Sequence, residues 1–238
     1  SEMCIRDRLS ILIYIGTNER GWAVIKNILI DLDGTLTDPK VGITTSARYG
    51  LEKIGHPISD EINIDWIIGP PLKASLAKIL NVEADHVLAE QALMGYRERF
   101  AVKGLYENHV FEGVAETLAE LKRRGYRLFV ATAKPTVYAK QILEHFDLAQ
   151  YFTDIYGSEL NGERTNKAEL IQYILEQQKL QADQCLMVGD REHDIFGARQ
   201  NGIDTIAVNY GYGSQEELAL AQPKYQIDRF NQLLDYFK

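Results

Sequence analysis

The fold is decided by residues 27–36, which read Asn27-Ile28-Leu29-Ile30-Asp31-Leu32-Asp33-Gly34-Thr35-Leu36. The short apolar run before Asp31 is typical of a strand that is buried on both faces of a sheet. Two residues apart, Asp31 and Asp33 point to the same side of the chain and repel each other unless a positive group lies near them. Gly34 supplies the turn that ends the run. Since a divalent cation would relieve the repulsion, the stretch predicts a buried strand that ends at a metal site.

The composition indicates a soluble globular protein of one large or two small domains. The chain has 238 residues, of which 45% are hydrophobic and 25% charged, as is usual for such proteins. A net charge of -8 and a pI near 5.2 argue against nucleic acid as a partner, because nucleic-acid binders present a basic face. Only Cys4 and Cys185 are present, so no disulfide framework is expected and a reducing cytoplasm is the predicted location.

Residues 1–25 are expected to be a non-essential extension. An apolar run at Leu9–Ile15 follows Arg6 and Arg8, which resembles a weak secretion signal. The run is too short to span a bilayer, and no small-x-small cleavage site follows it. We therefore expect no membrane association, and we expect a chain without residues 1–25 to keep its activity.

The segment from residue 44 to about 100 has helical periodicity and predicts a helical unit inserted into the core. Three helices are expected, one ending before Gly55, one starting near Leu72 and one over residues 87–100. Residues 37–40 are turn-like, and 64–68 is a possible strand. The segment Gly69-Pro70-Pro71-Leu72 is either a rigid turn between helices or a loop that faces the substrate. The predicted division is a core of residues 26–40 and 109–238, with the helical unit at 41–108.

From residue 110 onwards, helices and strands alternate. Strands are expected at 126–131, 155–157, 185–188 and, as the last clear one, 205–208. Helices are expected around 114–121, from Pro135 as first residue to 146, from Lys167, and up to 198–202. Such alternation predicts an α/β fold with a doubly wound parallel sheet.

Polar residues follow several of these strands. Asp31 and Asp33 follow the first strand, Thr132 the second, and Asp190 with Asp194 the strand that ends at 188. In doubly wound sheets, ligands bind beyond the carboxyl ends of the strands, so these groups are expected to share one cleft. Taken singly, they could equally be turn formers or helix caps, and Lys167 could be a solvated helix residue. Together they are poorly explained by chance.

Four segments resemble the motifs of the haloacid dehalogenase superfamily of phosphatases. They are Asp31-Leu32-Asp33-Gly34-Thr35, Thr132 after a strand, Lys167 at a helix start, and 189–194, which reads Gly-Asp-Arg-Glu-His-Asp. The resemblance covers about residues 26–238. It is greatest to the phosphoglycolate phosphatase-like branch and its 5'-nucleotidase relatives, which the segments 132–135 and Tyr210-Gly211-Tyr212-Gly213 also resemble.

This resemblance implies a magnesium-dependent phosphomonoesterase with a Rossmann-like core and a helical cap. Asp31 would be the nucleophile that forms an aspartyl-phosphate, and Asp33 the general acid and base. The Mg²⁺ ligands would be Asp31, the backbone carbonyl of Asp33, Asp190 and, directly or through water, Asp194. Thr132, Ala133 and Lys167 would bind the phosphate oxygens.

The leaving group and some alternatives stay open at this point. The substrate would be a small phosphorylated metabolite of the phosphoglycolate or nucleoside 5'-monophosphate type, selected by the cap through Gly69, Pro70, Pro71 and Leu72. A phosphomutase is the first alternative, although Thr35 favours the phosphatase. A binding protein without turnover is the second. Lys134 and Arg191 lie near the expected cleft without an assigned role, and the protein is expected to be a monomer or a homodimer.

Overall fold

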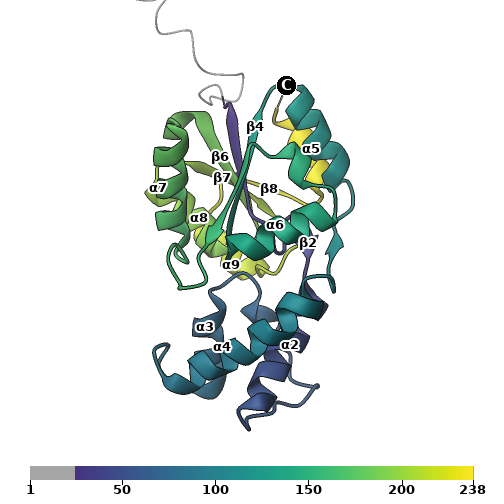
Figure 1. The fold of residues 1–238 in the computed structure, drawn as a ribbon. Helices are drawn as coiled ribbons and strands as arrows, with labels where there is room; N and C mark the ends of the chain where they lie inside the picture. The colour runs from purple at the N-terminus through teal and green to yellow at the C-terminus, as the bar shows by residue number, and fades with distance from the viewer. Residues whose placement is uncertain (1–24, 238) are drawn as a thin grey trace, which may run out of the picture.

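The computed structural model describes residues 25–237, and its core is a six-stranded parallel sheet (Figure 1). The order of the strands is β5-β4-β1-β6-β7-β8, and every neighbouring pair is parallel. This confirms the predicted α/β fold. The extension predicted at residues 1–25 lies outside the described residues except for Ile25. The strands are β1 (Asn27–Ile30), β4 (Arg127–Pro135), β5 (Asp154–Ser158), β6 (Cys185–Gly189), β7 (Asp204–Val208) and β8 (Tyr225–Ile227).

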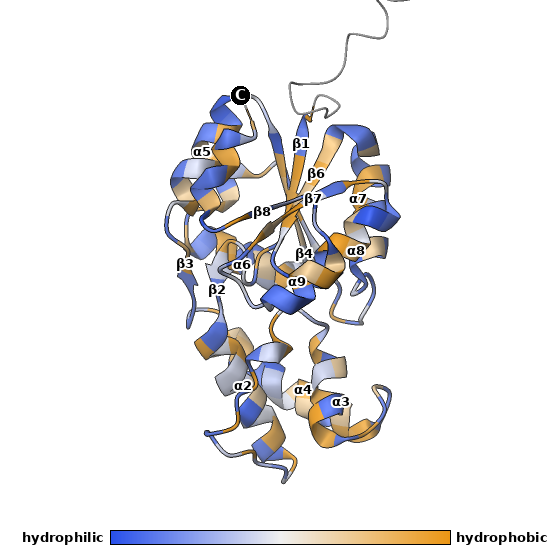
Figure 2. Ribbon diagram, turned by 180° about the vertical axis from the view of Figure 1, so that it is seen from behind, coloured by the Kyte–Doolittle hydropathy of each residue, from blue (hydrophilic) through white to orange (hydrophobic). Residues whose placement is uncertain are grey.

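The first strand lies in the middle of this sheet because its side chains are apolar on both faces. Ile28 and Ile30 belong to the same apolar cluster as residues of α5 and α6, whereas Leu29 packs with residues of α7 and α8 on the other face. Figure 2 shows the apolar character of the central strands β1 and β6. The helices that cover the sheet are α5 (Val114–Arg123), α6 (Thr136–His145), α7 (Lys167–Gln178), α8 (Glu192–Gln200) and α9 (Gln215–Ala221).

A helical unit lies beyond the carboxyl ends of these strands (Figure 1). It contains α2 (Lys40–Lys53), α3 (Leu72–Leu80) and α4 (Val87–Arg99), as the periodicity predicted. The chain enters and leaves it through an antiparallel ladder of β2 (Thr37–Asp38) and β3 (His109–Val110). Within residues 25–237, no helix combines the length and the hydrophobicity that crossing a membrane requires.

Three local predictions were wrong, and three further elements were not predicted. The turn expected at 37–40 is in fact β2 followed by the start of α2. The possible strand at 64–68 is a 3-10 turn, Asp65–Ile67, closed by a hydrogen bond from Ile67 N to Ile64 O. Strand β4 continues to Pro135, which therefore precedes α6, because this end of the strand pairs with β5 at Ser158. Strands β3 and β8 and helix α9 were not predicted, since elements of two, three and seven residues carry too little periodicity.

Helices α2 and α4 cross at a pair of glycines, and this contact yields a prediction about stability. A Cβ on Gly50 would lie 2.3 Å from the carbonyl oxygen of Ala92, and Gly95 faces Gly50 from α4. We expect Gly50→Ala to lower the free energy of unfolding by about 1–3 kcal/mol, because the backbones must move apart. Urea denaturation measures the loss. The control is Glu52→Ala at an exposed position of the same helix, and equal midpoints for the two variants would contradict the crossing.

Candidate active site

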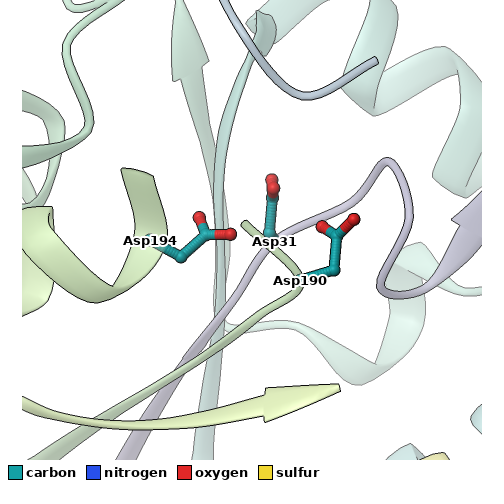
Figure 3. A group of neighbouring side chains, drawn as sticks. All are labelled: Asp31, Asp190 and Asp194. Atoms are coloured by element: carbon teal, nitrogen blue, oxygen red, sulfur yellow. The ribbon is translucent and has the colours of Figure 1, made fainter. Parts of the chain in front are cut away.

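Three buried aspartates meet at the carboxyl edge of the sheet (Figure 3). Asp31 follows β1, Asp190 follows β6, and Asp194 lies in the first turn of α8. One carboxylate oxygen from each lies within 4.8 Å of the others. Each residue is at most 4% exposed. The structure therefore brings together three of the predicted metal ligands, which come from distant parts of the chain.

Lys167, the first residue of α7, supplies one positive charge to this cluster. Its Nζ lies 2.7 Å from Asp194 Oδ1 and 3.2 Å from Asp31 Oδ1, and it donates a hydrogen bond of 2.8 Å to the carbonyl oxygen of Ala131. Its side chain is 5% exposed, so it is not a solvated surface lysine. One ammonium facing three carboxylates leaves a net negative charge in a buried place. Carboxylate oxygens are the ligands that Mg²⁺ prefers, so the donor set fits this ion.

The segment Tyr210-Gly211-Tyr212-Gly213 holds Asp190 in place. The backbone N–H of Tyr212 donates a hydrogen bond of 2.7 Å to Asp190 Oδ2. A Cβ on Gly211 would lie 2.3 Å from the Asp190 Cβ, and one on Gly34 would lie 2.2 Å from Oδ2. Glycine is thus needed on two sides of this carboxylate. In the sequence, only the family resemblance indicated that this segment matters.

The electrostatics of the cluster favour the binding of a cation. Burial raises the pKa of Asp190 well above its usual value, and the charges of Asp194 and Asp31 raise it further. Burial also raises the pKa of Asp194 to about 6, against the opposing effect of Lys167. For Lys167 itself, burial lowers the pKa, but Asp194 and Asp31 outweigh it and hold the ammonium charged. A divalent cation would lower the cost of keeping all three carboxylates ionised.

We expect Mg²⁺ to stabilise the protein, and more strongly at neutral than at acid pH. Because the pKa of Asp194 is about 6 in the folded protein instead of the usual 3.8, the folded state binds more protons than the unfolded state between these values. Stability in EDTA therefore falls as the pH rises through this range. Mg²⁺ removes that loss, so its effect on Tm should be larger at about pH 7.5 than at about pH 5. Calorimetry measures it, and an equal or larger shift at the lower pH contradicts the assignment.

Asp33 lies apart from the three-aspartate cluster, and its side chain faces a different partner. Its Oδ2 is 2.8 Å from Nζ of Lys134. Its Oδ1 is buried and has no hydrogen-bond partner among residues 25–237. Burial raises the pKa of Asp33, while Lys134 acts in the opposite direction. The predicted metal contact through the backbone carbonyl of Asp33 stays a prediction.

Two adjoining pockets open beside these residues. A pocket of about 230 Å³ is bounded by Asp33 and Lys134 of the core and by residues of the helical unit. The second contains Asp31, Lys167 and Asp194. Gly69, Pro70, Pro71 and Leu72 all line the first pocket, and Gly69 and Pro71 line both. The segment is therefore a boundary of the site as well as the lead into α3.

The structure separates the surroundings of Thr132 and Ala133, the two predicted phosphate-binding residues within β4. Ala133 lines both pockets. Thr132 lines neither of the two, is 2% exposed, and its Oγ1 accepts a hydrogen bond of 3.2 Å from the backbone N–H of Lys134. The placement of Thr132 thus fits a role in shaping the irregular end of β4, which carries Ala133 and Lys134.

Sequence reasoning left Arg191 without a role, and the structure places it between core and helical unit. Its guanidinium donates a hydrogen bond to the carbonyl oxygen of Ile68, and its Nε lies 2.8 Å from Oε1 of Glu217. A Cβ on Gly69 would lie 2.9 Å from Cγ of Arg191. Gly69 also has φ of +100°, which favours glycine. The only signal in the sequence was the position of Arg191 directly after Asp190.

The chain belongs to the haloacid dehalogenase-like hydrolase family, whose pattern matches residues 28–208. This confirms the family predicted from the four motifs. Among solved structures, the fold is similar to that of a predicted phosphatase from Clostridium acetobutylicum. That protein is 42% identical, with a TM-score of 0.86, and the match covers 90% of this chain and 98% of that one.

Named relatives agree with a hydrolase, with one exception. A 5'-nucleotidase of Pseudomonas aeruginosa is 48% identical over 84% of this chain and 89% of its own length. A phosphoglycolate phosphatase of Vibrio vulnificus is 31% identical over 89% of this chain and 95% of its own. The tyrosine-protein kinase PtkA of Mycobacterium tuberculosis is 39% identical over 78% of this chain, which spans only 62% of that protein. The predicted similarity to phosphoglycolate phosphatases and 5'-nucleotidases is confirmed.

Proposed function

We propose that the protein is a magnesium-dependent phosphomonoesterase that works through an aspartyl-phosphate. The observation that carries this proposal is the placement of Asp31 in one buried cluster with Asp190, Asp194 and Lys167. Asp31, Asp190 and Asp194 would hold Mg²⁺, with the backbone carbonyl of Asp33 as a further ligand. When bound, the ion would offset the carboxylate charge and polarise the phosphate.

The residues of the chain can carry both halves of the reaction. A carboxylate oxygen of Asp31 attacks phosphorus while the bond from phosphorus to the leaving oxygen breaks, and Asp33 gives its proton to that oxygen. In the second half, Asp33 takes a proton from water as the water attacks phosphorus, and inorganic phosphate leaves Asp31. Lys167 stabilises the negative charge on the phosphate oxygens, together with backbone N–H groups near Ala133 at the end of β4 and, as predicted from the sequence, Thr132.

The substrate we propose is a small phosphorylated metabolite of the phosphoglycolate or nucleoside 5'-monophosphate type. Residues 41–108 act as a cap that excludes water, and Gly69–Leu72 contact the leaving group from it. The two named phosphatase relatives support both substrate types. The acidic net charge argues against nucleic acid as a partner, and the scarcity of cysteine supports a cytoplasmic location. We propose that the enzyme is a monomer or a homodimer.

Release of inorganic phosphate tests the proposal. The panel contains phosphoglycolate, nucleoside monophosphates, sugar phosphates and p-nitrophenyl phosphate, each with Mg²⁺ and with EDTA. Magnesium-dependent release is the expected result. Activity that requires a catalytic bisphosphate would favour the phosphomutase instead, and no release from any compound would favour a protein that binds without turnover.

A further inference from the structure

Lys134 contacts both the core and the helical unit at the proposed site. Its Nζ lies 2.8 Å from Asp33 Oδ2, and the two side chains are 4% and 10% exposed. The same ammonium lies 4.5 Å above the centroid of the Phe100 ring. Phe100 begins the π-helical turn η2 (Phe100–Gly104) that follows α4. A charged group beside the proposed general acid thus rests on an aromatic face supplied by the cap, an arrangement that is favourable in a desolvated place.

The Phe100 ring is itself held in a cluster of aromatic rings. It stacks on Tyr96 with a centroid distance of 4.9 Å and meets Tyr138 of α6 edge to face at 5.5 Å. All three residues line the pocket that also contains Asp33. Phe100 is 1% exposed, so the ring cannot turn away while the helical unit stays in place. The aromatic ring that lies against the Lys134 ammonium is therefore held in place by its packing.

Asp33 has one oxygen that is paired and one that has no hydrogen-bond partner among the described residues. Oδ2 is paired with Lys134, and Oδ1 has no hydrogen-bond partner within the described part of the chain. A buried polar oxygen without a partner is unusual and costs free energy unless a ligand completes it. In the proposed reaction the missing partner is the leaving-group oxygen, which must lie within hydrogen-bond reach of the acid.

We propose that Lys134 is a positioning residue. Its ammonium lies on the Phe100 ring and holds Asp33 so that Oδ1 faces the oxygen of the leaving group. The inference rests on the proposed function, in which Asp33 gives its proton to that oxygen as the bond to phosphorus breaks. Lys134 keeps its own proton throughout. Because Phe100 belongs to the cap, the position of Asp33 depends on how the cap packs against the core.

Leaving groups of different basicity test this assignment. An alkoxide needs a proton to leave, whereas p-nitrophenolate is a weak base and leaves without one, and kcat/KM reports the steps up to the first loss of the leaving group. We expect Lys134→Met to lower kcat/KM for phosphoglycolate and AMP by roughly 30-fold or more, and for p-nitrophenyl phosphate by less than about threefold. Phe100→Leu, which alters no charge, should shift the same ratio by roughly threefold to tenfold.

A double variant separates positioning from direct phosphate binding. If Lys134 acts through Asp33, adding Lys134→Met to Asp33→Asn should cost nothing further. The matched control is Lys78→Met, because Lys78 also lies over an aromatic ring of the helical unit, Trp66 at 4.8 Å, yet lines neither pocket. The control should keep the wild-type ratio between substrates.

The outcomes distinguish this inference from the proposed function. Equal losses on all substrates, or a further loss in the double variant, would overturn the role of Lys134 while Asp33→Asn still shows the dependence on the leaving group. If Asp33→Asn shows no such dependence, or the wild-type protein hydrolyses none of the substrates, the proposed acid and the inference fail together. Should Lys134→Met not fold, Phe100→Leu decides, and an unchanged ratio in it rejects the positioning.

Discussion

Replacing Asp31 by Asn should lower the rate of phosphate release at least about 10³-fold, while the protein still folds. The amide keeps the shape of the side chain, but it is not nucleophilic. Asp31 occupies the end of β1, where Asn27–Ile30 are hydrogen-bonded between β4 and β6, so the position itself is rigid. The variant should therefore fail in chemistry and not in structure.

Steady-state phosphate release and circular dichroism together measure this effect. A second readout is the shift of Tm by Mg²⁺, which should become smaller because the cluster loses one carboxylate. The control is Asp60→Asn, which makes the same substitution at an exposed position of the helical unit and should match the wild type. Residual activity within about tenfold of wild type would remove Asp31 from the role of nucleophile.

Lys167→Met should produce the second large effect, on activity and on stability. The ammonium is the positive partner of Asp31 and Asp194 and has a third partner in the carbonyl oxygen of Ala131. Removing it leaves the three-aspartate cluster uncompensated, which we expect to lower the free energy of unfolding in EDTA by about 3 kcal/mol. Loss of a group that stabilises the transition-state charge should also lower kcat/KM about 10²-fold or more.

The stability of this variant should depend on pH. At about pH 5 the aspartates can take up protons, because burial already raises the pKa values of Asp190 and Asp194, so the destabilisation should be smaller than at about pH 8. Urea denaturation at the two pH values measures the difference. Lys140→Met, at an exposed position of α6, is the control. An unchanged rate and stability in Lys167→Met would remove Lys167 from the proposed roles in phosphate binding and charge compensation.

Much of the fold could be predicted because its signals are local. The run at 28–30, followed by the turn at Gly34, is typical of a buried strand, and its neighbours in the sheet carry similar short apolar segments. The missed helix α9 has only seven residues, and the missed strands β2, β3 and β8 are two or three residues long and exist through their pairing with other strands. No local pattern encodes such pairing.

The candidate site likewise contains residues that the sequence could predict and residues whose contacts it could not. Asp31, Asp190 and Asp194 could be found because each follows or nearly follows a predicted strand. The contact of Lys134 with Phe100, and of Arg191 with Ile68, depends on where the helical unit comes to lie over the core. Sequence spacing contains no information on that placement, so both residues remained without a role until the structure was known.

The order of the strands also sets the order in which a growing chain can complete the sheet. Asn27–Ile30 is the first strand to be synthesised, yet its two neighbours in the sheet are Arg127–Pro135 and Cys185–Gly189. During synthesis, this apolar strand lacks one neighbour until residue 189 has left the ribosome. The helices between residues 40 and 99 contact one another and are complete much earlier. A chain arrested before residue 185 would thus carry a formed helical unit beside an exposed strand edge, a hazard for aggregation that a chaperone could cover.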